Sequence, residues 1–246
     1  MYSINESYYS EYTKPVYEDI DGCISTLKQV PDGEVWTRDQ IKDTKHRMLL
    51  EDRDWTVVEN LPLHEDIKRN GAYRDFYIQN YQESIVNLAQ SGIKVIGYNF
   101  TPVYYKLRTH FNFSYDDKYA FSHFDPVAFS VFDLFILNRP SAEKDYNGYQ
   151  IHKAHILNNR LTELHKIELT NNIFHGFSSI VNNSLEELLS QIYAYSNVSN
   201  EDLRHNLEYF NSQIIPLAND LGVHLHCSAD NPCSNLFGLP GSPLKC

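Results

Sequence analysis

The chain has 246 residues, of which 42% are hydrophobic, and its formal net charge is −11 at pH 7. This length and apolar content suit one large domain or two small ones. The acidic balance argues against a nucleic-acid partner, because binding phosphates requires clustered Lys and Arg. No apolar stretch reaches the length of a membrane span, and the polar start lacks a signal-peptide pattern. We therefore expect a cytoplasmic protein with no membrane or nucleic-acid partner.

The first hundred residues alternate short strands with helices. Strands are predicted at 22–27, 55–60 and 93–100. A helix is predicted from Thr37 to about residue 51, with Thr37 as N-cap and Gln40 completing a capping box. A second helix is predicted over 73–90, ended by Ser91-Gly92. Apolar strands bounded by turns and separated by helices indicate βαβ units and a parallel sheet.

A long insertion, 101–183, interrupts this alternation. It holds an aromatic-rich stretch at 104–124, a predicted helix at about 125–138, and a polar helix at about 147–171. His152 and His155 are expected on a solvated face of that last helix. Two further helices, about 184–195 and 200–221, lead into a fourth strand at 223–227, and Ser184 with Glu187 forms a candidate capping box.

The end of the fourth strand carries the plainest candidate metal ligands. His224 and His226 lie two residues apart, so both side chains point to one strand face. Such a pair binds a metal or is merely structural. Cys227 and Cys233 lie beside it, but this spacing fits no zinc pattern.

The ends of the second and third strands supply polar candidates. Glu59 is either a site carboxylate or a solvated loop residue, and Asn99 is a candidate substrate contact whose amide can donate a hydrogen bond. Arg108 either pairs with a substrate carboxylate, which its fork suits, or ties down the insertion. The segment 64–66, His-Glu-Asp, either approaches the substrate or caps the helix after it, and capping is favoured.

Several segments together resemble the mannonate dehydratase family, in the family's order and approximate spacing. They are 31–36, 57–68, 98–103, 139–146, 214–218 and 237–240. The resemblance implies a TIM barrel of the xylose-isomerase-like kind. With four βα strands, this chain is expected to form an incomplete (β/α)4 half-barrel, a single domain over 1–246 with 101–183 inserted. The resemblance also implies the conversion of D-mannonate to 2-dehydro-3-deoxy-D-gluconate in glucuronate catabolism, with Mn²⁺ or Fe²⁺.

The chain also departs from the family pattern. Lys28 and Gln29 stand where the family has two His, and Tyr105 and Lys106 stand where it has Asp-Trp. The strand-four end is about two residues longer and lacks one carboxylate. The family's remaining ligands (Cys, His and Asp) and its His and Tyr acid–base groups come from later strands, beyond residue 246.

These observations define the expected site. The resemblance implies His226 as a metal ligand, and Asn99, Arg108 and Glu59 are candidate substrate contacts, while the acid–base groups are unknown. Weak or absent metal binding and no activity of this chain alone are expected. The alternative is a non-catalytic relic that at most binds a sugar acid or a partner chain. The first and fourth predicted strands are expected to be exposed edges of the sheet, which also predicts self-association.

Overall fold

The computed structural model describes residues 5–6, 23–27, 29–113, 121–177, 184–229, 232 and 235–241. Lys28 and Cys233 lie outside these residues. The chain divides into two compact units, residues 1–100 with 201–228 and residues 101–200 with 229–246. The second unit begins where the insertion was expected to begin. It takes in 184–200 and 229–246 as well.

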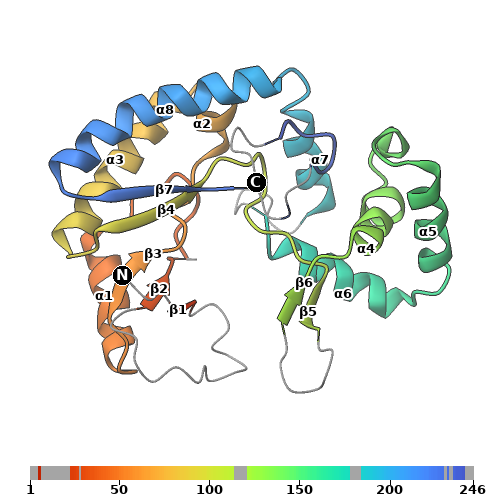
Figure 1. Ribbon diagram of the computed structural model, residues 1–246, viewed down its shortest axis with the longest axis horizontal. Helices are drawn as coiled ribbons and strands as arrows, with labels where there is room; N and C mark the ends of the chain where they lie inside the picture. Colours follow the sequence, from red (N-terminus) through yellow and green to blue (C-terminus); the bar gives the residue numbers. More distant parts are fainter. Residues whose placement is uncertain are drawn as a thin grey trace. The chain divides into compact units, whose positions relative to one another are not determined.

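The first unit is built on a parallel sheet with strand order β1-β2-β3-β4-β7 (Figure 1). The strands are β1 (Asn5–Glu6), β2 (Cys23–Ser25), β3 (Trp55–Val58), β4 (Val95–Asn99) and β7 (His224–Ser228). The four predicted strands are present, and β1 is an addition that pairs with β2. The expectation that β2 would be an exposed edge was therefore wrong. Over the described residues the sheet does not close into a barrel, which makes it an incomplete, TIM-barrel-like α/β fold.

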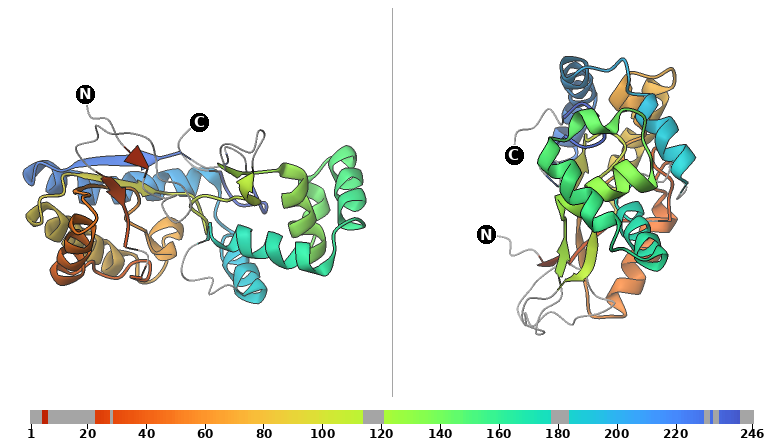
Figure 2. Two further views of the ribbon diagram at one scale, coloured as in Figure 1. Left: turned by 90° about the horizontal axis from the view of Figure 1, so that it is seen from below. Right: turned by 90° about the vertical axis from the view of Figure 1, so that its right-hand side faces the viewer.

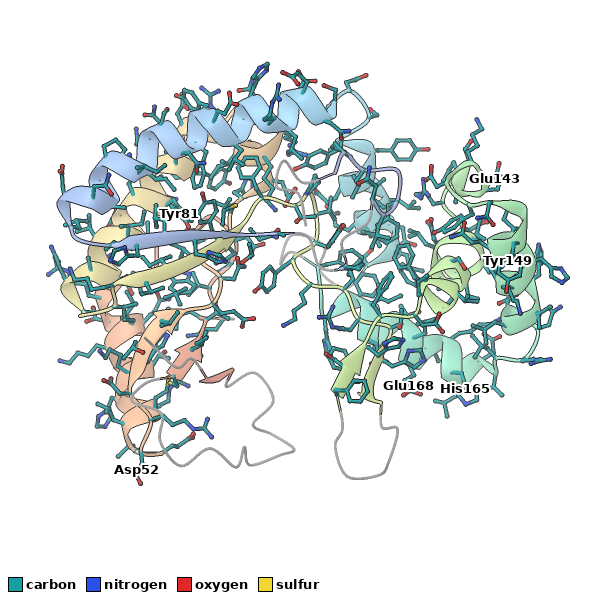
Figure 3. All side chains as sticks on the ribbon, in the orientation of Figure 1. Asp52, Tyr81, Glu143, Tyr149, His165 and Glu168 are labelled. Carbon is teal, nitrogen blue, oxygen red and sulfur yellow. The ribbon has the colours of Figure 1, made fainter. Side chains whose placement is uncertain are left out.

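The helices of this unit lie against one face of the sheet (Figure 2). They are α1 (Arg38–Leu49), α2 (Glu65–Arg69), α3 (Arg74–Gln90) and α8 (Asn200–Asp220). Phe210 of α8 contacts Tyr81 of α3 and Tyr98 of β4, with ring centroids 5.1 and 5.6 Å apart (Tyr81 is labelled in Figure 3). These buried rings fill the space between sheet and helices, where edge-to-face packing of aromatic side chains is favourable.

The capping box predicted at Thr37 is confirmed, whereas Ser184 acts as a simple N-cap without the reciprocal bond of a box. Thr37 accepts the N–H of Gln40, and the Gln40 side chain accepts the N–H of Thr37 in return. Ser184 accepts the N–H of Glu187 at the start of α7 (Leu185–Tyr193). Gly92 follows α3 with a φ of +85°, a backbone conformation that glycine adopts without strain. No helix in the described part of the chain is both long and apolar enough to cross a membrane.

The second unit contains an antiparallel hairpin and short helices. The hairpin, β5 (His110–Phe113) with β6 (Phe121–His123), was not predicted. The helix α4 (Pro126–Val131) is continued by the π-helix η2 (Phe132–Ile136). The 3-10 helix η3 (Ala142–Asp145) and the helices α5 (Gly148–Asn158), α6 (Glu163–Phe174) and α7 follow.

The prediction of one helix over 147–171 was wrong. The chain leaves the helical path after Asn158 and begins a new helix at Glu163, where Thr162 accepts the N–H of His165. A threonine in extended backbone that satisfies an orphan N–H favours a new start over a continuous helix. The exposed positions of His152 and His155 agree with the expected solvated face.

The segment 235–241 packs within the second unit. Phe237 is 2% exposed, and its ring centroid lies 4.8 Å from that of Phe129 and 5.9 Å from that of Phe177. Leu236 and Leu239 are also buried. Residues that follow β7 in the sequence therefore belong to the core of the second unit.

Candidate functional site

The carboxyl ends of β4 and β7 lie side by side in the first unit. The two strands pair in register, with Gly97 opposite His226 and Asn99 opposite Ser228. The Asn99 side-chain amide donates to the carbonyl oxygen of Ser228 over 3.4 Å, and Asn99 is buried. The structure therefore brings two of the predicted site residues, Asn99 and His226, to one edge of the sheet.

His226 presents its imidazole to solvent. His224 and His226 are both exposed, while Leu225 between them is partly covered, so the two histidines share one face of the strand as predicted. The neighbouring position on β4 is Gly97, so no side chain of β4 lies beside His226. The imidazole is accordingly accessible to a ligand from that face.

Cys227 does not join the two histidines. It neighbours Tyr98, whose ring packs against α8, and the Tyr98 hydroxyl donates to Asn211 Oδ1 over 2.7 Å. Burial, followed by the neighbouring Cys227 thiol, raises the pKa of Tyr98 well above its ordinary value. Strand alternation thus turns this cysteine away from the histidine face, which disfavours a zinc knuckle there.

Glu59 follows β3 and depends on a close approach between strands. Its N–H donates to the carbonyl oxygen of Ser25 over 3.0 Å, and its own carbonyl oxygen faces Gly97. A Cβ at position 97 would collide with that oxygen. Glycine is required here because two backbones meet. Glu59 and Asn99 thereby stand at the ends of two successive strands, and His226 lies at the middle of the next strand of the sheet.

Arg108 lies in the second unit. Its Nε donates to Ser122 Oγ over 3.2 Å, and its Nη1 donates to the carbonyl oxygen of Leu107 over 2.7 Å. These bonds hold the Arg108 side chain against Ser122 of β6 and against its own neighbour Leu107, within the second unit. Tyr105 is likewise held within this unit, because its N–H donates to Gly176.

His64 caps a helix, as favoured from the sequence. Its Nδ1 accepts the N–H of Asp66 over 3.1 Å, and its ring stacks on Tyr77 with centroids 3.6 Å apart. Burial lowers the pKa of His64, against the opposing effect of the carboxylates of Asp66 and Glu65. Glu65 is fully buried and pairs with Lys68 over 2.7 Å. The segment 64–66 therefore begins the helix α2.

Sequence reasoning missed a buried charged cluster in the second unit. Arg139 Nε and Nη2 donate to the two carboxylate oxygens of Asp133 over 2.8 and 2.7 Å. Arg139 Nη2 also donates to Asp145, and the hydroxyl of Tyr146 donates to Asp133 over 2.8 Å. The segment 139–146 carries part of the family resemblance, but its sequence did not predict these hydrogen bonds. Asp133 is fully buried, and its local sequence does not predict this burial.

The described residues do not hold a complete metal site. Within them, no group of three or more His, Cys, Asp or Glu side chains is arranged to bind an ion. One imidazole suits several divalent metals about equally and cannot select among them. The donor set present therefore does not fit Mn²⁺ or Fe²⁺ without further ligands.

Comparison with known proteins identifies the family. Residues 12–242 match the family model of D-mannonate dehydratase (UxuA). A mannonate dehydratase of Marinomonas sp. (strain MWYL1) is 35% identical over 221 residues, which is 89% of this chain and 56% of that protein. One from Chromohalobacter salexigens is 34% identical over 220 residues, again 89% of this chain and 56% of that protein.

A solved structure agrees with this. The crystal structure of mannonate dehydratase from Streptococcus suis serotype 2 aligns with a TM-score of 0.61 and 27% sequence identity, covering 90% of this chain and 50% of that one. The chain spans about half the length of the relatives it matches. The resemblance seen in the sequence is confirmed over most of the chain: it belongs to the mannonate dehydratase family.

Proposed function

We propose that this chain contributes part of the active site of a metal-dependent hydro-lyase. The reaction is the removal of water from D-mannonate to give 2-dehydro-3-deoxy-D-gluconate, a step of glucuronate catabolism. The observation that supports it is that Glu59 and Asn99 stand at the carboxyl ends of β3 and β4, with His226 on the neighbouring strand β7. Active sites of β/α barrels are built at that end of the strands.

Each of these residues has a chemical use toward a sugar acid. His226 would provide one imidazole ligand to a divalent Mn²⁺ or Fe²⁺, which when bound stabilises negative charge developing on substrate oxygens. The Asn99 amide and the Glu59 carboxylate would donate to and accept from substrate hydroxyls. Further ligands and the acid–base groups would come from the part of the relatives' sequence that this chain does not cover.

We expect no measurable dehydration of D-mannonate by this chain alone, with or without Mn²⁺. Groups that act as a unit lose most of the catalysis when one is missing, and the described residues hold no complete set of ligands. The assay is formation of the 2-keto-3-deoxy acid, followed through its carbonyl group. Turnover above that of a His226→Ala variant would contradict this expectation.

Metal affinity tests the role of His226 separately. Mn²⁺ should bind the chain only weakly, because tight sites need several ligands in fixed geometry. His226→Ala should remove this weak binding, while His224→Ala, at the other exposed histidine of β7, is the matched control. Calorimetry that finds tight one-site binding abolished by His226→Ala would show that a full ligand set is present.

A second candidate function is a non-catalytic relic that binds a sugar acid or a partner chain. The lack of a three-ligand group among the described residues favours it. The two candidates differ once a polypeptide carrying the rest of a family member is added. Restored turnover that depends on His226 supports the active-site proposal, whereas D-mannonate binding without turnover supports the relic.

A further inference from the structure

A pocket of about 570 Å³ lies within the second unit. Two segments that carry the family resemblance, 139–146 and 237–240, meet in its wall. The end of α7 and the turn at 195–200 complete it. None of the candidate residues Glu59, Asn99, Arg108 and His226 lines this pocket. Its volume lies in the range of small-molecule sites.

Arg139 forms the charged inner wall. Its side chain is 10% exposed, and its Nε and Nη2 are bound by Asp133 and Asp145. Its Nη1 forms no hydrogen bond with any described residue. Two carboxylates and one guanidinium give the triad Asp133–Arg139–Asp145 a formal charge of −1. The inner wall therefore offers a hydrogen-bond donor beside a region that attracts positive charge.

Gly238 keeps these atoms accessible. Its φ is +67°, and a Cβ there would lie 3.1 Å from Asp145 Oδ2 and 3.4 Å from Arg139 Nη1. A side chain at this position would crowd both groups. The preceding Phe237, buried in the aromatic core of the unit, holds the glycine in place.

The outer wall is of opposite charge and partly apolar. Lys144 is exposed, and it forms no ion pair with any residue that the structure describes. Leu189 and Ile192 of α7, together with Leu239, provide an apolar surface. The pocket thus places a carboxylate, an unpaired arginine donor, a lysine and an aliphatic wall around one volume.

We propose that this pocket binds an α-amino acid with a branched aliphatic side chain. The ammonium group would donate to Asp145, and the carboxylate would accept from Arg139 Nη1 and Lys144. The side chain would lie on Leu189 and Ile192. A simple carboxylate would meet the net negative triad, and a simple amine would leave both basic donors unmatched. A zwitterion satisfies both signs of charge, and charge-assisted hydrogen bonds are the stronger ones.

The test is calorimetric titration of the full chain with L-leucine, which should show saturable binding at one site. Asp145→Asn should weaken binding about tenfold or more, the loss expected for one charge-assisted hydrogen bond. Glu143→Gln is the matched control, because Glu143 (labelled in Figure 3) lies in the same short helix but does not line the pocket. Unchanged thermal unfolding of Asp145→Asn would show that the fold is kept.

Ligand analogues test each half of the zwitterion. 4-Methylpentanoate lacks the ammonium, leucinol lacks the carboxylate, and glycine lacks the side chain. Each should bind about tenfold more weakly than L-leucine, or not at all. The proposal is overturned if L-leucine does not bind, if 4-methylpentanoate binds as well as L-leucine, or if Asp145→Asn binds it unchanged. His226→Ala should leave L-leucine binding intact, which separates this result from the fate of the proposed hydro-lyase site.

Discussion

At the scale of single residues, His64 links a helix cap to the pH dependence of stability. Burial holds its pKa below the ordinary value of 6.5, so the folded chain favours the neutral ring that accepts the Asp66 N–H. The unfolded chain takes up the proton more readily. The stabilisation is therefore complete above about pH 6.5 and is lost as the pH falls from there through the lower pKa of the folded state.

We expect the free energy of unfolding, from urea titrations, to fall as the pH is lowered below about 6.5, the ordinary pKa of histidine. His64→Asn should reduce this fall, because asparagine also caps helices but does not titrate. His152→Asn, at an exposed position of α5, is the control and should leave the slope unchanged. An equal slope in all three proteins would refute the assignment to His64.

Asp133 provides a second prediction at this scale. It is fully buried and accepts from Arg139 and Tyr146. Asp133→Ala leaves the arginine without its main partner and should cost about 3–5 kcal/mol of unfolding free energy. Glu163→Ala breaks a pair with Lys166 that is 3.1 Å long, but Glu163 is 86% exposed, so the loss should stay below about 1 kcal/mol. Equal losses in denaturant titrations would contradict the burial argument.

At the scale of elements, the contact between β3 and β4 depends on a missing side chain. Gly97→Ala would press a methyl group against the Glu59 carbonyl oxygen, and we expect a loss of about 1–3 kcal/mol, as for other overpacked sites. Gly148→Ala, at the first residue of α5, meets no atom within 4 Å and should change stability by less than about 0.5 kcal/mol. Thermal unfolding of both variants makes the comparison.

Helix starts that depend on only a few neighbouring residues were predicted well from the sequence. Thr37 and Ser184 begin helices because a side chain and a backbone N–H three residues on are all that a cap needs. The break before Glu163 was missed because the polar pattern continues across it, although Thr162 carries the same signal.

Long-range contacts could not be predicted from local patterns. β1 pairs with β2, and the partner residues Asn5 and Cys23 are 18 positions apart in the sequence. The burial of Glu65 and Asp133 depends on tertiary partners and covering elements. Glu59 and Asn99 could be chosen as candidates because strand ends could be located, whereas the contacts of Arg108 with Ser122 and Leu107 could not be derived from spacing.

At the scale of the whole molecule, β7 is an edge strand in the described sheet, and its histidine face is exposed. Unprotected edges pair with other chains. We propose that the isolated chain self-associates through β7, with a mass by light scattering that rises with concentration. His224→Lys should reduce this, because a charge on an edge strand opposes pairing. Leu164→Lys, at a 72% exposed position of α6, is the control. If it alone restores a monomer, the α6 surface is responsible.

The division of the chain into two interleaved units has a consequence for its synthesis. The first unit needs residues 201–228 to complete it, and the second needs residues 229–246. Neither unit is complete when the ribosome has translated only the first two hundred residues. Nascent chains usually fold one domain after another, but here both units remain incomplete until residues beyond 200 have been synthesised. Chaperones that shield apolar surfaces would be engaged by both halves until β7 and the Phe237 segment emerge.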